Sequence, residues 1–229
     1  MARNEHGQPV GEPVDWSRRP VVAPVTLVGR TCRLEPWSGV HLDGLFDATV
    51  RNSPASTWTY LRPPPPADPG ALGEVLDELA ADPDAVPLVI CDPAGQVLGT
   101  ASYLRLDAAN GLVEVGWIAY SAALQRTTAA TEAMFLMMRH AFDDLGYRRY
   151  EWKCDALNEP SRRAAERLGF TYEGTFRNAM VYKGRNRDTA WFSVTDAEWP
   201  AVRAAFESWL SPENFDAAGN QVSPLRARA

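Results

Sequence analysis

The chain has few of the residues that build disulfide frameworks or metal centres. Its 229 residues include three cysteines and three histidines. Cys32, Cys91 and Cys154 form no Cys-x-x-Cys pair, so the sequence has neither a disulfide framework nor the spacing of a zinc site. We therefore expect no metal, and a reducing cytoplasm as the location of the protein.

Long apolar runs and an excess of basic residues are also missing. No apolar run approaches the roughly 20 residues needed to cross a membrane. Residues 1–24 carry charges without the apolar centre of a secretory signal. A net charge of −6 and a pI near 5.2 argue against a nucleic-acid binder or a protein of anionic membranes. Small molecules or peptides remain as the expected ligands.

The composition predicts one domain with two extensions. A hydrophobic content of 45% is enough for one buried core, which we place in a single domain at residues 25–210. Residues 1–24 are rich in proline and predict an extended N-terminal arm, packed through Trp16. Residues 211–229 have few apolar side chains and predict a C-terminal tail.

A strand, a turn and a helix are predicted in the middle of the chain. The run Leu112–Tyr120 is apolar and rich in β-formers, and Gly116 within it indicates a bulge or a close backbone approach. From Ala130 onward, apolar residues recur every three or four positions up to Gly146, which can end a helix with positive φ. A helix therefore begins near Thr128.

The start of that helix is either an anion site or an ordinary cap. Its first turn has no bulky side chain and no acidic residue before Glu132, so backbone N–H groups and the positive end of the helix dipole are open to an anion. A pyrophosphate would fit there. In the alternative interpretation, Thr128 simply caps its own helix.

A second strand and a short helix follow. Arg148–Cys154 alternates polar and apolar residues, as strands do. Asn158 is a good N-cap, and Gly169 can close the helix after Leu168. The segment Asn158–Leu168 is therefore predicted to be helical.

The same patterns predict the remaining elements. Helices are expected at Ser38–Val50, Gly70–Ala81 and Ala197–Leu210. Strands are expected at Val25–Leu34, Pro87–Cys91, Gln96–Leu106, Thr171–Tyr182 and Thr189–Thr195.

Several segments carry a family resemblance: Glu114–Trp117, Gln125–Ala133, Asn158–Phe170 and Glu173–Gly174. Through them, residues 25–200 resemble the GNAT superfamily of acetyl-CoA-dependent N-acyltransferases, and within it the branch of ribosomal-protein N-terminal acetyltransferases of RimJ/RimL type. In the phosphate-binding motif of the family, Thr128 stands in place of the central glycine. Either the loop takes a conformation that threonine allows, or the contacts to the pyrophosphate differ slightly from those of the family.

The resemblance implies an α/β (α+β) fold, with a mixed, mostly antiparallel sheet flanked by helices. The strands around Glu114 and Cys154 would be parallel and splay apart. It also implies acetyl-CoA as acyl donor, with the pantetheine arm on the free strand edge and the pyrophosphate on the helix start. The residues that would bind acetyl-CoA are Trp117, Ile118, Ala119, Gln125, Arg126, Thr127, Thr128, Ala129, Ala130, Asn158 and Ser161.

Acetyl transfer to an amine needs a base for the amine and a proton for the leaving thiolate. Glu114 stands where members of the superfamily place a carboxylate base, but it is equally well explained as an ion-paired strand residue. Asp155 is a second candidate for the base or for binding the substrate ammonium, and otherwise stabilises a turn. Many members use a tyrosine on the short helix as the acid, and here Ser161 is the nearest hydroxyl.

The acceptor pocket is expected to be lined by Trp58, Tyr60 and Trp152, although such aromatic residues are more often part of the core. The loop after Trp58 and the hairpin at residues 171–195 should shape it. The basic segment Lys183–Arg187 either guides an anionic ligand or is a plain exposed turn. Cys154 is interpreted as a buried thiol rather than a nucleophile, because nothing in the sequence brings His140 near it.

The predicted function is acetyl-CoA-dependent transfer of an acetyl group directly to a primary amine of a small molecule or a peptide N-terminus, without metal. One alternative is transfer from succinyl-CoA or another acyl-CoA, whose acyl carboxylate would meet Arg105 or Arg126. The other is a non-catalytic acyl-CoA-binding or interaction module. Glu114 or Asp155 pointing into the cleft would favour the enzyme. A homodimer, if formed, would use the last hairpin or the N-terminal arm.

Overall fold

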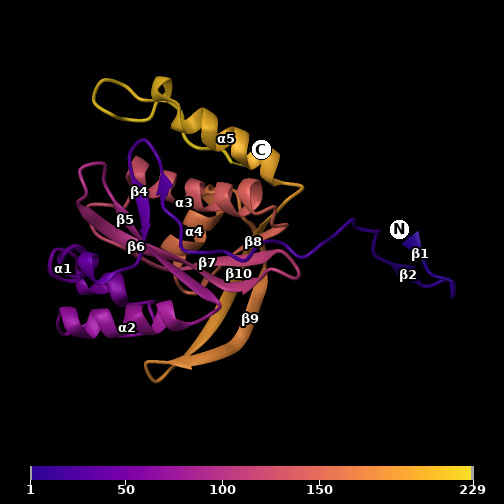
Figure 1. Ribbon diagram of the computed structural model, residues 1–229, viewed down its shortest axis with the longest axis horizontal. Helices are drawn as coiled ribbons and strands as arrows, with labels where there is room; N and C mark the ends of the chain where they lie inside the picture. Colours follow the sequence, from indigo (N-terminus) through magenta and orange to yellow (C-terminus); the bar gives the residue numbers. More distant parts are fainter. Residues whose placement is uncertain (1, 228–229) are drawn as a thin grey trace.

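The computed structural model describes residues 2–227 (Figure 1). Within this range, eight strands form one sheet in the order β3-β4-β5-β6-β7-β8-β10-β9. The strands are β3 (Leu27–Val28), β4 (Arg33–Pro36), β5 (Ala85–Cys91), β6 (Val97–Asp107), β7 (Leu112–Tyr120), β8 (Arg149–Asp155), β9 (Thr171–Tyr182) and β10 (Arg185–Thr195). Neighbouring strands are antiparallel except for β7 and β8, which are parallel. The predicted fold class is confirmed.

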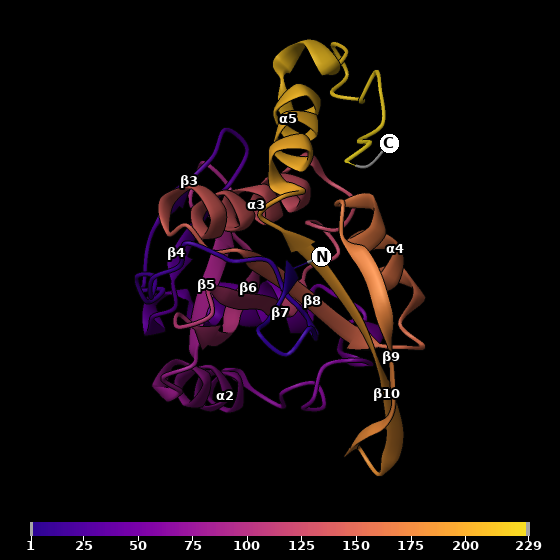
Figure 2. The same cartoon turned by 90° about the vertical axis from the view of Figure 1, so that its right-hand side faces the viewer.

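Helices lie on both faces of the sheet. They are α1 (Leu42–Phe46), α2 (Pro69–Ala81), α3 (Thr128–Arg139), α4 (Glu159–Arg167) and α5 (Trp199–Leu210). Helices α3 and α5 lie on one face, and α1 and α2 lie on the other (Figures 1 and 2). The larger core contains residues of α3, α4 and α5, and a smaller one lies beneath α1 and α2. Within residues 2–227, no helix has both the length and the apolar character needed to cross a membrane.

Strands β7 and β8 separate part of the way along their length. Their pairing runs from Leu112 opposite Arg149 to Val115 opposite Trp152 and then ends. Beyond that point the register of β7 with β6 shifts, and Trp117 takes a φ of +50°. A bulge of this kind inserts a residue and bends the strand. The splay predicted for this strand pair is confirmed, and Gly116 correctly indicated the bulge beside it.

Helix α3 begins at Thr128, as predicted, but its cap is Thr127. The Thr127 hydroxyl accepts a hydrogen bond from the N–H of Ala130 at 3.1 Å and donates to the Leu124 carbonyl at 2.7 Å. The interpretation in which Thr128 caps the helix is therefore wrong. The loop residue with positive φ is Arg126, at +63°, so Thr128 needs no strained conformation.

The short helix α4 forms as predicted. The Asn158 side chain accepts a hydrogen bond from the N–H of Ser161 at 3.2 Å and so caps the first turn. The helix ends before Gly169, whose φ is +94°. A Cβ at this glycine would lie 3.0 Å from Ala227 and 3.1 Å from Val202, so both conformation and space favour glycine.

The predicted strand Val25–Leu34 is instead a pair of short strands, β3 and β4, around a tight turn. The buried Glu132 carboxylate on α3 accepts hydrogen bonds from the N–H groups of Arg30 at 2.8 Å and Thr31 at 2.6 Å. A Cβ at Gly29 would lie 2.6 Å from that carboxylate carbon. The turn is thus held by a residue far away in the sequence, which strand periodicity cannot reveal.

The two ends of the chain differ in how they pack against the rest of the protein. Near the N-terminus, Ala2–Arg3 and Pro9–Val10 form a small two-stranded sheet away from the body of the protein (Figure 1). The arm then packs through Trp16, as predicted, with its indole donating to the Ala109 carbonyl at 2.7 Å. The tail folds back on the protein, where Leu225 and Ala227 are buried in the larger core.

Candidate active site

A cleft of about 1820 Å³ opens where β7 and β8 separate. It is lined by these strands, the starts of α3 and α4, residues of the loop 54–62, the β9–β10 hairpin and part of the tail. The predicted site residues on its wall are Tyr60, Glu114, Trp117, Ile118, Gln125, Arg126, Thr127, Thr128, Ala130, Trp152, Asp155, Asn158 and Ser161. Trp58, Ala119 and Ala129 are not part of this lining.

The start of α3 offers backbone donors to the cleft. Within residues 2–227, the N–H groups of Thr128 and Ala129 meet no protein acceptor, whereas that of Ala130 is bound by the cap. The exposed side chain of Arg126 lies next to them in the chain. This end of the cleft therefore has unpaired amides, the positive end of a helix dipole and a nearby cation, which suit a pyrophosphate.

Arg167 is a second cation on the cleft wall, and the sequence did not reveal it. From the last turn of α4, its guanidinium donates to the Thr131 hydroxyl at 3.1 Å and 3.2 Å and lies 5.4 Å from the Trp209 ring centroid. Burial lowers the pKa of this guanidinium. Its place became visible only once α3, α4 and α5 were packed together.

The free edge of β7 and the start of α4 form the middle of the cleft. Beyond Val115, β7 has no pairing with β8, so its backbone groups on that side are available to a ligand. Trp117 and Ile118 line this edge, whereas the Ala119 side chain is buried and the residue pairs with Thr100 on β6.

Ser161 contributes a hydroxyl to the same part of the cleft. Its Oγ accepts a hydrogen bond from the Trp152 indole at 3.0 Å. The oxygen acts as acceptor toward Trp152, and the same hydroxyl is hydrogen-bonded to the Cys154 thiol, whose pKa it lowers. The Asn158 side chain is already committed to capping α4, while the residue also lines the cleft.

Glu114 is a buried carboxylate on the wall of the cleft. It is 2% exposed and lies directly opposite Glu151 on the parallel strand β8. Its Oε2 lies 2.8 Å from Lys153 Nζ and 3.8 Å from Arg105 Nη1. The ion-paired interpretation is therefore observed, and the carboxylate also lies on the cleft wall, where the role of base remains a prediction.

The environment of Glu114 favours its protonated form. Burial raises the pKa of this carboxyl above its ordinary value, and the nearby charge of Glu151 acts in the same direction. Lys153 and Arg105 lower the pKa and offset part of the effect of burial. A carboxylate with a raised pKa is a better proton acceptor than one in water, as a general base requires.

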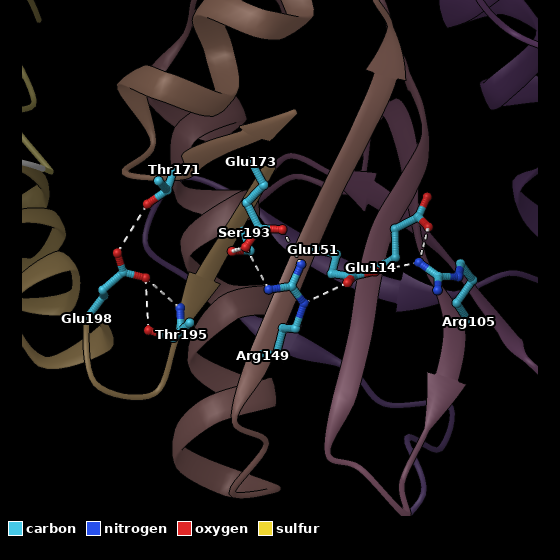
Figure 3. Close-up of polar contacts among 9 residues, drawn as sticks. All are labelled: Arg105, Glu114, Arg149, Glu151, Thr171, Glu173, Ser193, Thr195 and Glu198. Carbon is cyan, nitrogen blue, oxygen red and sulfur yellow. Dashed lines mark hydrogen bonds and ion pairs between the residues drawn. The ribbon is translucent and has the colours of Figure 1, made fainter. Parts of the chain in front are cut away.

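A chain of ion pairs holds the neighbouring carboxylate Glu151 in place (Figure 3). Arg105 binds one of its oxygens, and Arg149 Nε donates to the other at 2.7 Å. Arg149 also donates to both oxygens of Glu173, at 2.8 Å and 2.6 Å. Because Glu151 is held by two arginines, Glu114 is the carboxylate of this pair that remains turned to the cleft.

Asp155 uses both of its oxygens within the protein. Oδ1 accepts from the N–H of Leu157 at 2.9 Å, and Oδ2 accepts from the Tyr182 hydroxyl at 2.7 Å. Burial and this hydrogen bond raise the pKa of Tyr182 to about 12. The turn-stabilising interpretation of Asp155 is therefore observed, and Tyr182 is a neighbour that the sequence did not reveal.

The aromatic residues predicted to line the acceptor pocket occupy three different positions. Tyr60 lines the cleft, and its hydroxyl donates to the Leu157 carbonyl at 3.0 Å. Trp152 also lines the cleft but is 6% exposed and belongs to the larger core. Trp58 is 1% exposed, and its indole donates to the Thr49 carbonyl at 2.9 Å. Trp58 is therefore a core residue rather than part of the cleft wall.

The loop after Trp58 and the last hairpin meet across the cleft. Lys183 Nζ donates to the carbonyls of Trp58 at 2.6 Å and Thr59 at 3.2 Å. The hairpin β9–β10 reaches beyond the rest of the sheet toward this loop (Figure 2). These two segments line the cleft, as expected. Lys183, in the turn between β9 and β10, joins them through its hydrogen bonds.

Two further groups of polar side chains lie outside this chemistry. Burial raises the pKa of the Cys154 thiol, and His140 is paired with Asp144 at 2.9 Å, so Cys154 is the expected buried thiol.

The side chains of Glu35, His41 and Cys91 offer ligand atoms within 4.8 Å of one another and could hold a metal ion. The sequence spacing did not reveal this group.

The fold and the cleft define the class of protein, a CoA-dependent acyltransferase scaffold, and comparison with known proteins identifies the family. The family model described as an acetyltransferase (GNAT) domain matches residues 32–171. The chain is 47% identical to a GCN5-related N-acetyltransferase from Brucella melitensis, with 92% of this chain and 96% of that chain covered and a TM-score of 0.89. The chain therefore belongs to the GNAT acetyltransferase family.

Two other relatives support this assignment. A GNAT-family protein from Chromobacterium violaceum ATCC 12472, described as a probable acetyltransferase, is 37% identical, with 84% of this chain and 99% of that chain covered and a TM-score of 0.78. A Bacillus subtilis (strain 168) protein described as "Putative ribosomal N-acetyltransferase YdaF" is 31% identical over 106 residues, which are 46% of this chain and 57% of YdaF. The predicted family is confirmed, and the YdaF match supports the predicted RimJ/RimL-like branch.

Proposed function

We propose that this protein is an acetyl-CoA-dependent N-acetyltransferase that moves an acetyl group directly to a primary amine of a small molecule or a peptide N-terminus. The observation that carries the proposal is the position of Glu114. This buried carboxylate faces the cleft on one of the two splayed strands, and the same cleft contains the unpaired amides of α3.

The cleft suits the three parts of the donor. The amides of Thr128 and Ala129, with Arg126 and Arg167, suit the phosphates. The free edge of β7 at Trp117 and Ile118 suits the amide groups of the pantetheine arm. Acetyl-CoA supplies the thioester-bound acetyl group, which would lie between the splayed strands, near Glu114.

The residues of the cleft then account for each proton. Glu114 takes a proton from the substrate ammonium, directly or through water, so that the amine can attack the thioester carbon. Backbone N–H groups of the Trp117–Ala119 strand stabilise the negative charge that develops on the carbonyl oxygen. As the carbon–sulfur bond breaks, the nitrogen loses its second proton, which passes to the leaving thiolate through the Ser161 hydroxyl, so that Ser161 ends unchanged. The products are the acetylated amine and CoA with a free thiol, and the proton on Glu114 is released to water.

Glu114 is a better candidate for the base than Asp155. Both carboxylates line the cleft, which favours an enzyme over a non-catalytic binding module. Asp155, however, accepts hydrogen bonds on both oxygens, from Leu157 and Tyr182. We therefore assign Asp155 to positioning Tyr182 and the turn before α4.

We extend the proposal to location and assembly. Cys32, Cys91 and Cys154 are free and buried, which fits a reducing cytoplasm. For a homodimer we favour β9, the edge strand of the sheet, which exposes Phe176 and Val181. Analytical ultracentrifugation of the wild type and of Phe176→Ser tests this arrangement. We expect the wild type to sediment as a dimer and Phe176→Ser to dissociate more readily.

Calorimetric titration with acetyl-CoA tests the donor site directly. Thr128→Asp places a negative charge in the first turn of α3, where it stabilises the helix but repels a phosphate. The neutral variant Thr128→Asn has the same shape and serves as the control. We expect at least tenfold weaker binding for Thr128→Asp than for Thr128→Asn, with both variants folded. Equal affinities would show that the phosphates do not bind at α3.

A further inference from the structure

Among residues 2–227, Arg187 is a buried cation in the cleft without an ion-pair partner. It lies on β10, is 8% exposed and lines the cleft. Within residues 2–227, the guanidinium of Arg187 forms no ion pair and no hydrogen bond. Its Nε is buried and has no acceptor. Removing a charge from water without a counter-charge is costly, so a folded protein rarely keeps such a group without a use for it.

The other cations of this region are already engaged. Arg105 and Lys153 are paired with Glu114 or Glu151. Lys183 donates to two backbone carbonyls. Arg187 differs from all of these because its contacts are with an aromatic ring, the Tyr182 ring centroid lying 5.5 Å from its central carbon.

Its neighbours place Arg187 at the end of the cleft where the thioester would lie, which we call the reacting end. Tyr182, beneath its guanidinium, donates to Asp155, and Asp155 pairs with Thr189 on β10. The positive charge of Arg187 also lowers the pKa of the Cys154 thiol against the larger, opposite effect of burial, so it lies near that thiol as well. It is thus grouped with Asp155 and the start of α4 rather than with the phosphate end at α3.

We propose that Arg187 binds a carboxylate group of a substrate at the reacting end of the cleft. The inference rests on the proposed acyltransferase function and goes beyond it by naming a chemical class. A guanidinium is planar and matches a carboxylate with two parallel hydrogen bonds, and the burial of Arg187 strengthens such a pair. The bound anion also supplies the ion-pair partner that Arg187 does not have among residues 2–227.

Two substrates could carry this carboxylate. An acceptor with both an amine and a carboxylate, such as an amino acid, would place its ammonium toward Glu114 and its carboxylate on Arg187. An acyl donor with a terminal carboxylate, such as succinyl-CoA, would place that end of the acyl chain there instead. Both substrates share the same recognition chemistry, and binding measurements distinguish them.

The donor is tested by titrating acetyl-CoA and succinyl-CoA into the wild type, Arg187→Gln and Arg185→Gln. Arg185 is an exposed arginine on the same hairpin and serves as the matched control. If the donor carries the carboxylate, the wild type and Arg185→Gln bind succinyl-CoA at least tenfold more tightly than acetyl-CoA. Arg187→Gln loses that preference and keeps its affinity for acetyl-CoA.

The acceptor is tested on the protein saturated with CoA, by titration with amino acids and with their C-terminal amides. If the acceptor carries the carboxylate, the acids bind at least tenfold more tightly than the amides, and only Arg187→Gln removes the difference. Arg187→Lys keeps the charge without the planar fork and should give an intermediate preference. If Arg187→Gln does not fold, the same titrations with Arg187→Lys still test the proposal.

The proposal is overturned if the wild type shows neither preference, or if a preference is unchanged in Arg187→Gln and Arg187→Lys. A failure of the acyltransferase function would look different, because the wild type would then bind none of the CoA thioesters.

Discussion

The two faces of strand β8 differ in chemistry and in what they do. Tyr150, Trp152 and Cys154 point into the larger core. The residues between and after them, Glu151, Lys153 and Asp155, belong to the charged face. Because side chains alternate along a strand, one seven-residue segment serves packing on one face and chemistry on the other. Stability and activity should therefore respond to different substitutions only one residue apart.

The largest expected effect is on the packed face. Phe192 on β10 lies opposite Trp152 and is fully buried. Phe192→Ala removes most of a buried aromatic side chain and should lower the free energy of unfolding by about 3–5 kcal/mol. Denaturant unfolding followed by fluorescence measures the change. A loss below about 1 kcal/mol would show that this face is not tightly packed.

The adjacent residue sharpens the comparison. Ser193 is also buried, but it lies opposite Glu151 and donates to Glu173 at 2.7 Å. Ser193→Ala loses one hydrogen bond to a charged group, and we expect a loss of stability of about 1–3 kcal/mol. A cost as large as that of Phe192→Ala would mean that the two faces contribute equally to stability.

The charged face should show its role in the pH dependence of activity. Lys153 lowers the pKa of Glu114, which burial raises. Lys153→Met removes the lowering effect, so the pKa of Glu114 should rise, and the acidic limb of kcat/KM should move to higher pH. The profiles of wild type and variant, measured with the same acceptor, test this direction. An unmoved limb would exclude Glu114 as the group that titrates there.

Local sequence patterns predicted most of the elements that build the site. The apolar run of β7, the small-residue start of α3 and the Asn158 cap of α4 are each encoded within a short stretch of sequence, so periodicity and capping rules found them. The choice between Thr127 and Thr128 as cap was beyond these rules, because both residues are suitable.

Contacts between distant segments could not be predicted in this way. Glu132 binds a turn a hundred residues earlier, and Tyr182 reaches Asp155 only because the β9–β10 hairpin folds beside β8. The unpaired state of Arg187 is also a property of the packed protein, since the sequence around it contains acidic residues such as Asp188. Whether Arg187 forms an ion pair depends on the directions of the acidic side chains around it, and the sequence does not give these directions.

The central claim is that Glu114 is the base of an acetyl transfer in this cleft, and Glu114→Gln tests it most directly. The variant should be compared with wild type in two measurements, the affinity for acetyl-CoA by calorimetry and the turnover by CoA release with an accepted amine. The account predicts unchanged affinity and a turnover lowered by roughly 10²-fold or more, because the base is lost while the groups that bind the donor at α3 and β7 are kept. A variant with wild-type turnover would contradict it.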